Sequence, residues 1–332
     1  MSYTVQYIEQ DLQIPTLSAV LNPGELSKYL YPVLPATWGT LHDIGVRVLQ
    51  HHAGSRCTVE IALQTTSGEH ELIGKAYATD RLDVCRVMEK LARDGFGPEE
   101  EFSVPQPLAY VPALHLLLQE KVHGSLAKEI FLQSNDQCRA LAAQRSARWL
   151  AAFHATDLQA ERIFKLSDQL PLMEQWTEEI ATISGSLKDK AYQLLRGLEA
   201  VVPGLGGAEA CAGHGSYSPL QIVFAKGRTV TFDWDGYCMA DPNRDLARFI
   251  IALRRLALGR LRSIRALDTA AELFLRTYIA MDKSRLTAQL PAYESAICLE
   301  FAHRVLRHKH RHWQMKVEVL VGEGLRILEE NG

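Results

Sequence analysis

The segment from residue 211 to residue 249 constrains the fold more than any other part of this chain. It contains two short strand-like runs, at residues 221–224 and 229–232, joined by a Lys-Gly turn at residues 226–227. Two short apolar runs separated by a glycine-containing turn are typical of a β-hairpin. We therefore expect a hairpin here, with the rest of the chain organised around it.

Polar residues flank the predicted hairpin at both ends. His214 and Gly215 precede its first run, and Asp233 and Asp235 follow its second run. Carboxylate oxygens are the ligands that hard cations such as Mg²⁺ prefer. The segment therefore predicts a site that holds a charged ligand or a metal ion.

Residues 44–122 have the pattern of a small antiparallel sheet with one helix. Apolar and polar side chains alternate with a period of two along residues 56–63, as in a half-buried strand. The order strand–strand–strand–helix–strand–strand predicts an α+β arrangement. The expected strands are residues 44–50, 56–63, 70–78, 108–111 and 114–122, and the expected helix is residues 80–94.

The chain becomes helical after Gly124, which makes residues 121–125 the best domain boundary. The expected helices are residues 135–155, 169–184, 187–200, 240–258, 264–281, 286–310 and 313–330. We expect residues 1–43 to form an extension that packs on a lobe formed by residues 44–122. Residues 123–332 would form a helical lobe that contains the segment 211–249.

Composition excludes several classes of protein. The net charge of −3 gives no reason to expect a nucleic-acid partner. No apolar run approaches the roughly 20 residues of a membrane helix, and the first residues lack the basic start and apolar core of a signal peptide. The six cysteines include no CxxC pair. We therefore expect a cytoplasmic protein with reduced cysteines.

Lys75 lies in the middle of the third expected strand, between Gly74 and Ala76. Two interpretations are open. The residue is either an ordinary lysine on a half-exposed strand or the partner of Glu89, fourteen positions on in the following helix. A strand lysine held by a helix glutamate is the arrangement with which kinases direct an ammonium group at nucleotide phosphates.

Taken together, these motifs resemble the aminoglycoside phosphotransferase/choline kinase group of the protein-kinase-like fold. A strand lysine is followed by the hinge-like sequence LLLQEKVHG at residues 116–124. A His-Gly loop, a hairpin, FDWD at residues 232–235 and DPNRDLARF at residues 241–249 then occur in the order of that group. The resemblance covers most of the chain from about residue 44 onward. It implies a bilobal fold with a small antiparallel-sheet N-lobe and a mainly helical C-lobe.

The resemblance also implies a nucleotide site for ATP between the two lobes. Lys75 and Glu89 would manage the phosphates, and the backbone near Glu120 and Val122 would bind the adenine. Arg56 matches an arginine at the start of the second strand in some members of the group. The turn at residues 52–55 would then cover the phosphates.

The metal position is implied in the same way. Asp233 matches the aspartate that holds Mg²⁺ against the nucleotide phosphates, and Gln221 stands where the group has a second metal ligand, asparagine. Glutamine keeps an amide oxygen on a longer side chain. Asp241 and Asp245 match acidic residues whose role in the group is to support the loops, although Asp245 would also suit the first turn of a helix.

One position departs from the group in a way that concerns catalysis. Ser216 stands where the catalytic aspartate is expected, and a serine at neutral pH is not a proton acceptor and carries no charge. His214 and Asp235 are the nearby residues that would compensate. Two hypotheses stay open: an ATP-dependent phosphotransferase that acts on a small-molecule hydroxyl, and a pseudokinase that binds nucleotide or a protein partner without catalysis.

Two basic clusters complete the set of candidates. His308 and His312 have the spacing of a metal pair on a helix, although a solvated basic helix face is the simpler interpretation. A second cluster follows the DPNRDLARF motif. It would either neutralise an anionic partner or be solvated at the surface, and we expect solvation. Its members are Arg254, Arg255, Arg260, Arg262 and Arg265.

Overall fold

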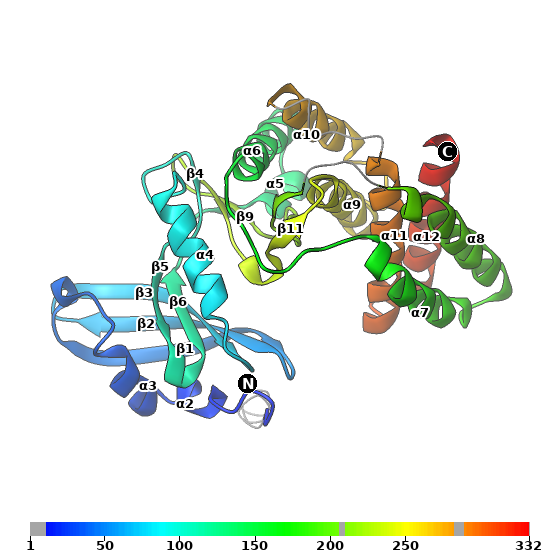
Figure 1. Cartoon of the computed structure of the whole chain (residues 1–332). Coiled ribbons are helices and arrows are strands. Elements are labelled where there is room, and N and C mark those ends of the chain that lie inside the picture. Colours follow the sequence, from blue (N-terminus) through cyan, green and yellow to red (C-terminus); the bar gives the residue numbers. More distant parts are fainter. Residues whose placement is uncertain (1–10, 206–209, 282–288, 332) are drawn as a thin grey trace. The chain divides into compact units, whose positions relative to one another are not determined.

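The computed structural model describes residues 11–205, 210–281 and 289–331. The chain divides into two compact units. Residues 1–124 and 225–232 form the first unit, and residues 125–224 and 233–332 form the second. The first is built on an antiparallel sheet and the second is mainly helical (Figure 1), which confirms the expected α+β class.

The first unit contains a five-stranded sheet in the order β1-β2-β3-β6-β5, with every neighbouring pair antiparallel. All five strands were expected from the sequence, and the period-two pattern supported the one over residues 56–63. The helix α4 follows β3 directly. The elements are β1 (Leu41–His52), β2 (Arg56–Thr65), β3 (Gly68–Tyr77), α4 (Leu82–Arg93), β5 (Pro107–Val111) and β6 (Leu116–Glu120).

The N-terminal segment packs on one face of this sheet. Helices α2 (Leu17–Leu21) and α3 (Pro23–Leu30) contribute buried side chains to the same apolar cluster as strands β1, β2, β3 and β6. Asn22 caps α3 by accepting hydrogen bonds from the backbone of Gly24 and Glu25. Residues 11–43 of the expected extension therefore bury one sheet face, while residues 1–10 lie outside the described residues.

Residues 225–232 belong to the first unit, whereas the sequence placed the whole segment 211–249 in the helical lobe. Strand β10 (Thr229–Thr231) pairs in parallel with β4 (Phe102–Ser103). The guanidinium of Arg228 forms an ion pair with Glu120 at 2.8 Å and donates to the Pro98 carbonyl at 3.1 Å. These contacts attach the turn after the first hairpin run to the end of β6.

The second unit contains a set of helices and two short strand pairs. Strand β8 (Cys211–Gly213) pairs with β11 (Cys238–Ala240), and β7 (Ser125–Leu126) pairs with β9 (Ile222–Phe224). Helix α11 packs against α7, α8, α9 and α12. The helices are α5 (Ala127–Gln133), α6 (Asp136–His154), α7 (Leu170–Ala181), α8 (Gly185–Val201), α9 (Asn243–Arg260), α10 (Asp268–Met281), α11 (Leu290–His308) and α12 (Trp313–Asn331).

Most of these helices match the expected ones to within a few residues. The helix predicted for residues 286–310 is α11 from Leu290 onward, and residues 286–288 lie outside the described residues. The sequence missed α5 and the strands β8 and β11, which are too short to show a period. In the part of the chain that the structure describes, no helix is both long and apolar enough to cross a lipid bilayer.

An aromatic cluster packs the segments that carry Tyr217 and Trp234 against α6. The Trp149 ring lies 5.6 Å from the Tyr217 ring and 5.9 Å from the Trp234 ring, measured between centroids. Tyr217 also donates its hydroxyl to the Ser146 carbonyl at 2.7 Å. Because these side chains are fully buried, the residues next to Tyr217 and Trp234 have well-defined positions.

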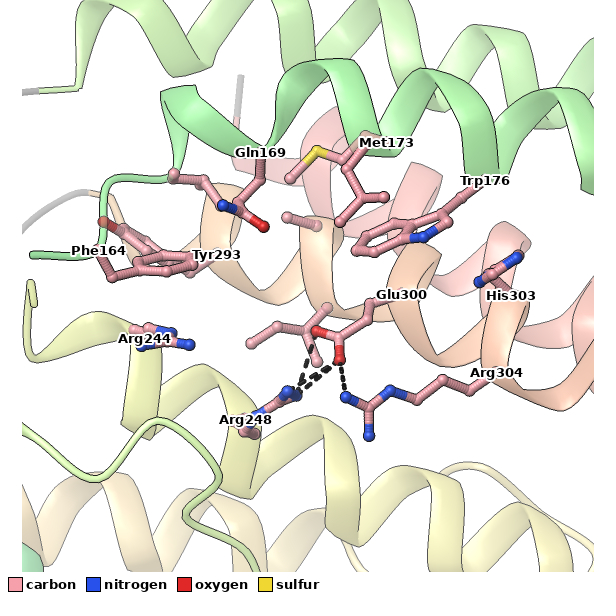
Figure 2. A pocket seen from close by; sticks show the side chains of 14 residues that line it. Phe164, Gln169, Met173, Trp176, Arg244, Arg248, Tyr293, Glu300, His303 and Arg304 are labelled. Carbon is pink, nitrogen blue, oxygen red and sulfur yellow. Dashed lines mark hydrogen bonds and ion pairs between the residues drawn. The ribbon is translucent and has the colours of Figure 1, made fainter. Parts of the chain in front are cut away.

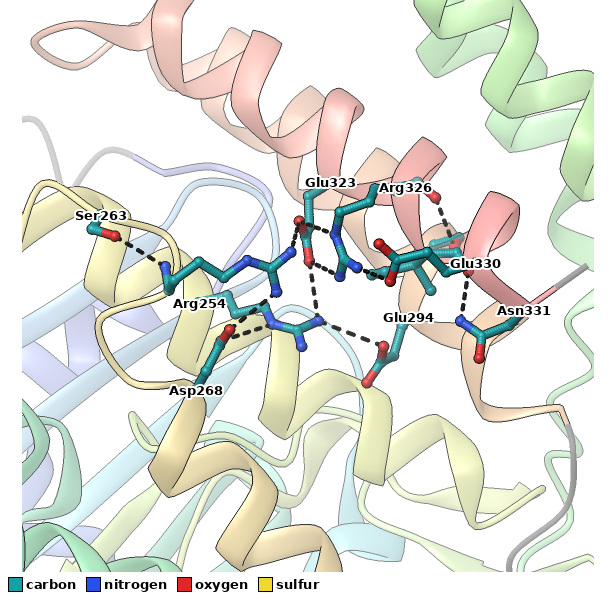
Figure 3. Close-up of polar contacts among 12 residues, drawn as sticks. Arg254, Ser263, Asp268, Glu294, Glu323, Arg326, Glu330 and Asn331 are labelled. Atoms are coloured by element: carbon teal, nitrogen blue, oxygen red, sulfur yellow. Dashed lines mark hydrogen bonds and ion pairs between the residues drawn. The ribbon is translucent and has the colours of Figure 1, made fainter.

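The arginine cluster after α9 is not simply solvated, as we had expected. Arg254 is largely buried and forms ion pairs with Asp268, Glu294 and Glu323, and Arg265 pairs with Asp268 and Glu323 (Figure 3). The solvation prediction was therefore wrong for Arg254, because carboxylates from α10, α11 and α12 gather around it. Arg260 and Arg262 are exposed as expected.

The ion pairs in Figure 3 predict how the stability of the fold depends on pH. Burial raises the pKa of Glu294 to about 7, although the charge of Arg254 opposes the shift. The unfolded chain releases this proton near pH 4.5, so the folded state binds more protons between about pH 4.5 and 7. Stability should therefore fall as pH rises through this window, by about 2–3 kcal/mol for this group.

The variant Glu294→Gln should lose that fall, because a glutamine does not titrate. Urea unfolding at several pH values would measure the difference in free energy between wild type and variant. Glu318→Gln is the matched control, because Glu318 forms an exposed pair with Lys190. Identical pH profiles for wild type and Glu294→Gln would contradict the prediction.

Candidate active site

The loop that begins after β8 is held by one buried carboxylate. Asp245, in the first turn of α9, is 1% exposed and accepts hydrogen bonds from the backbone of two loop residues. The His214 N–H lies 2.6 Å from Oδ2, and the Gly215 N–H lies 2.9 Å from Oδ1. The sequence left its role open between loop support and helix start, and the contacts show loop support from the first turn of the helix.

A histidine of α6, His154, also stabilises the charge of Asp245. The His154 Nε2 atom lies 3.4 Å from Oδ2 of Asp245, and its Nδ1 atom lies 2.8 Å from the Tyr278 hydroxyl. Burial alone would raise the pKa of the Asp245 carboxyl. The hydrogen bond and charge of His154, followed by the charges of His214 and Arg244, outweigh burial and lower this pKa to about 2. Asp245 is therefore ionised at neutral pH.

Gly215 is required by the shape of the loop. Its φ is 77°, and a Cβ atom at this position would lie 2.3 Å from the Gly236 carbonyl oxygen. Any other residue would force the two loops apart, because the carbonyl oxygen that its Cβ atom would meet belongs to the backbone. The Gly215 carbonyl in turn accepts a hydrogen bond from Nε of Arg248 at 3.1 Å.

The Ser216 side chain lies between the two loops that flank the hairpin. Its Oγ atom is 3.1 Å from Nδ1 of His214 and 3.3 Å from the Asp233 carbonyl oxygen. The Ser216 N–H also points at His214 Nδ1, at 3.4 Å. The hydroxyl is only partly buried, whereas the His214 ring is fully buried. The structure thus brings three of the predicted residues together.

Asp233 has an unusual backbone conformation for a residue with a side chain. Its φ and ψ are 72° and 62°, in the left-handed region, and it directly precedes the 3₁₀ turn Trp234–Gly236. This conformation costs about 1–2 kcal/mol for residues other than glycine. The surrounding structure maintains it, which points to a functional role for the direction of this carboxylate. Asp235 lies within the turn and is partly buried.

Gln221 lies just before β9, and its Oε1 atom accepts a hydrogen bond from the Ser218 hydroxyl. A carbonyl oxygen has two lone pairs, so this contact leaves the amide oxygen able to bind a cation as well. A carboxylate and an amide oxygen are donors that suit Mg²⁺. The side chains of Asp233 and Gln221 therefore fit the metal that the sequence predicted.

The first unit contains the predicted nucleotide residues. Lys75 on β3 is 6% exposed and pairs with Thr58 and Leu117 across the sheet. The neighbouring Gly74 faces the apolar cluster, since a Cβ there would touch Val59 and other members of that cluster. Lys75 therefore points to the opposite face of the sheet.

Glu89 on α4 is exposed, and its carboxylate accepts a hydrogen bond from the Cys85 thiol at 3.7 Å. Burial, and then the charge of Glu89, raises the pKa of that thiol to about 12. Among contacts of the described residues, no ion pair joins Glu89 to Lys75. The role of Glu89 at the phosphates stays a prediction.

The remaining predicted nucleotide residues lie at or just beyond the ends of strands β2 and β6. Arg56 begins β2 and pairs with Tyr77. The Glu120 N–H donates to the Gln106 carbonyl at 2.8 Å, and its carboxylate binds Arg228. Val122 follows the end of β6 and is half-buried. Since the Glu120 N–H is already bonded, Val122 is the better candidate for a backbone donor to adenine.

The turn between β1 and β2 has a partner that the sequence did not reveal. Asp11 Oδ2 lies 2.9 Å from Nε2 of His51 and accepts the Gly54 N–H at 2.8 Å. The hydrogen bond from Gly54 is the largest cause that lowers the pKa of Asp11. A single aspartate far from any motif gives no sequence signal, so this contact between the extension and the turn was missed.

The histidine pair proposed from its spacing does not form on one helix. Helix α11 ends at His308, and Lys309 is left-handed with a φ of 45°, so His312 is not one turn further along. His303 instead stacks on Trp176 and lies 3.1 Å from a Glu179 carboxylate oxygen. Across the ranges that the structure describes, no three His, Cys, Asp or Glu side chains are arranged to hold a metal ion.

The family model described as "Phosphotransferase enzyme family" matches residues 72–282, which include both the strand lysine and the loop held by Asp245. The chain belongs to this family. A comparison with curated protein sequences finds no significant match.

Solved structures agree with this assignment at the level of the fold. A candidate aminoglycoside phosphotransferase from Ralstonia eutropha has a TM-score of 0.65 at 17% identity, covering 92% of this chain and 97% of the other. A choline/ethanolamine kinase family protein from Mesorhizobium loti has a TM-score of 0.57 at 12% identity, covering 92% and 95%. Aminoglycoside phosphotransferase APH(4)-Ia has a TM-score of 0.61 at 13% identity, covering 91% and 98%. The bilobal kinase-like fold expected from the motifs is thereby confirmed.

The loop geometry predicts that Asp245→Asn will destabilise this phosphotransferase family member. Asparagine has one carbonyl oxygen where the carboxylate uses two, and it carries no charge beside His154. Loss of a buried, paired carboxylate costs about 3–5 kcal/mol. Urea unfolding would measure the change in free energy.

Asp136→Asn is the matched control, because Asp136 lies in the first turn of α6 and its side chain is 97% exposed. Removal of a favourable helix-dipole contact there should cost no more than about 0.5–1 kcal/mol. Equal destabilisation by the two variants would show that Asp245 acts only on its helix.

Proposed function

We propose that this chain transfers the γ-phosphoryl group of ATP to a hydroxyl group of a small molecule. The observation that carries the proposal is the Asp245 carboxylate, which accepts the N–H groups of His214 and Gly215 and so holds Ser216 beside Asp233. Family membership supports the same activity.

Residues of the first unit are the candidates for contact with the nucleotide. Lys75, with Arg56 nearby in the sheet, would contact the phosphates, and the backbone at Val122 would contact the adenine. Structures similar in fold support ATP as the ligand, since one is named as a ternary complex with ADP and hygromycin B and another with ATP and streptomycin. Asp233 and Gln221 would hold Mg²⁺, which neutralises charge on the transferred phosphoryl group when bound.

The proton of the acceptor hydroxyl has a different route from the one that a carboxylate would provide. Ser216 Oγ is 3.1 Å from His214 Nδ1, a distance suited to proton transfer. The Ser216 N–H points at the same Nδ1 atom, which favours the tautomer with an unprotonated Nδ1. Ser216 would accept the proton of the substrate while it passes its own proton to His214. Asp235 is a second candidate acceptor for that proton.

The pseudokinase alternative rests on the same serine. Its hydroxyl is 3.3 Å from the Asp233 carbonyl oxygen, so a hydroxyl that donates there is not available to His214. General-base help is worth only about 10²–10⁴-fold in rate, so loss of the carboxylate is compatible with slow transfer. The two alternatives therefore differ in turnover and share nucleotide binding.

Nucleotide binding predicts a rise in the unfolding temperature with ATP and Mg²⁺. At ATP about 100 times above its Kd, binding adds about 2.7 kcal/mol to the free energy of unfolding. Lys75→Met and Asp233→Asn should abolish most of the rise, which differential scanning fluorimetry would detect. Lys28→Met is the matched control, because Lys28 is exposed on α3. A rise that is unchanged in both site variants would place the nucleotide elsewhere.

The proton route predicts a graded series at position 216. Ser216→Ala should lower the rate of ADP release about 10²-fold without a change in the apparent affinity for ATP, because only the proton acceptor is lost. Ser216→Asp should retain or exceed the wild-type rate with uncharged hydroxyl compounds, because it supplies a carboxylate as the proton acceptor. A coupled assay with ATP, Mg²⁺ and a panel of hydroxyl compounds would measure the rates.

The same assay, applied also to Asp233→Asn, separates the phosphotransferase hypothesis from the pseudokinase hypothesis. ADP release that is equal in wild type and Asp233→Asn would support the pseudokinase. Equal activity in wild type and Ser216→Ala would show that the serine takes no part in proton transfer.

A further inference from the structure

A cavity of about 370 Å³ lies within the second unit, between α7, α9 and α11 (Figure 2). Its volume is typical of a site for a small molecule. Three aromatic side chains line it, Phe164, Trp176 and Tyr293, and the charged residues Arg244, Arg248, Glu300 and Arg304 lie around its floor.

The floor of this cavity touches the loop that carries Ser216. Arg248 Nε donates to the Gly215 carbonyl at 3.1 Å. An Nη1 atom of Arg244 lies 3.2 Å from the point that a Cβ atom would occupy on Gly215. Two arginine side chains of the cavity lining therefore separate a bound molecule from Gly215, the residue that precedes Ser216.

The charges around the cavity do not balance. Glu300 is shared between two arginines, at 2.9 Å from Arg248 and 2.6 Å from Arg304. His303, which also lines the cavity, pairs with Glu179. The three arginines and the one glutamate leave a net charge of two positive units on the lining.

Arg244 is the least compensated of these residues. Its guanidinium stacks on the Phe164 ring, with the carbon 3.6 Å from the centroid, and donates to the Cys238 sulfur at 2.8 Å. Within residues 11–205, 210–281 and 289–331, no carboxylate forms an ion pair with it. A guanidinium has five N–H donors, and burial without acceptors is costly. Burial accordingly lowers the pKa of Arg244. An anion in the cavity would supply acceptors and an opposite charge to this guanidinium.

We propose that the acceptor substrate of this chain is a small organic anion that carries a hydroxyl group, bound in this cavity with its carboxylate or phosphate on Arg244 and Arg304. This inference rests on the proposed phosphoryl transfer. The faces of Trp176 and Tyr293 suit a flat or apolar part of the same molecule. Aminoglycosides are polycations, and the positive lining disfavours them as acceptors.

The charge of the ligand can be tested without nucleotide by isothermal titration. The probes share one ring and differ in charge: 4-hydroxyphenylacetate, 4-hydroxybenzylphosphonate and the cation tyramine. Both anions should bind with millimolar or better affinity that weakens as salt increases, and tyramine should bind at least 10-fold more weakly. The carboxylate and phosphonate titrations distinguish the two anionic groups.

Two variants on α11 should move the affinity in opposite directions. Arg304→Gln should weaken binding of the better anion about 5–10-fold, and Glu300→Gln should strengthen it by a similar factor. Arg307→Gln is the matched control, because Arg307 lies on the same helix, does not line the cavity and is exposed. Circular dichroism and the unfolding temperature would confirm that each variant is folded.

Equal or tighter binding of tyramine would overturn the proposal. So would the absence of anion binding at 10 mM, or an unchanged affinity in both Arg304→Gln and Glu300→Gln. A parallel titration with ATP and Mg²⁺ keeps this failure separate from failure of the proposed function. ATP binding without anion binding overturns only the acceptor class, whereas anion binding without ATP turnover overturns only phosphoryl transfer.

Discussion

The buried charge of Asp245 is the interaction on which the second unit depends. One oxygen binds the His214 N–H, and the other binds the Gly215 N–H, so the loop is fixed at two successive residues. His154 stabilises the charge from α6, and the aspartate itself belongs to α9. Two helices and the loop therefore meet at one carboxylate. The position of Ser216 follows from this contact, because the residue directly follows Gly215.

The sequence predicted most of the fold because its signals are local. A period of two marks the strand that begins at Arg56, and the helix expected over residues 135–155 is present as α6. The order of the His-Gly, FDWD and DPNRDLARF motifs indicated the kinase-like arrangement of both units. What the sequence missed in the fold were segments of two to seven residues, such as β8, which exist only because β11 pairs with them.

The site was less predictable, since its contacts join residues far apart in the sequence. The contact of Asp11 with Gly54 and that of Arg228 with Glu120 give no local signal. Two of the three arginines of the cavity belong to the DPNRDLARF motif, but that motif is equally compatible with surface residues. Their unbalanced charge appears only when α11 brings Glu300 to them and leaves Arg244 with a thiol.

Ser216 and the arginine-lined cavity are connected by electrostatics. An aspartate at position 216 would place a negative charge on the loop whose Gly215 contacts both Arg248 and Arg244. Two like charges about 4 Å apart repel by about 4 kcal/mol at the effective dielectric constant of a protein surface. An anionic acceptor next to this loop would meet that repulsion, whereas a neutral serine avoids it. If the acceptor is an anion, as proposed, Ser216 and the arginine-lined cavity are therefore two parts of one adaptation. The loss of a base at position 216 then removes a charge that such a substrate could not tolerate.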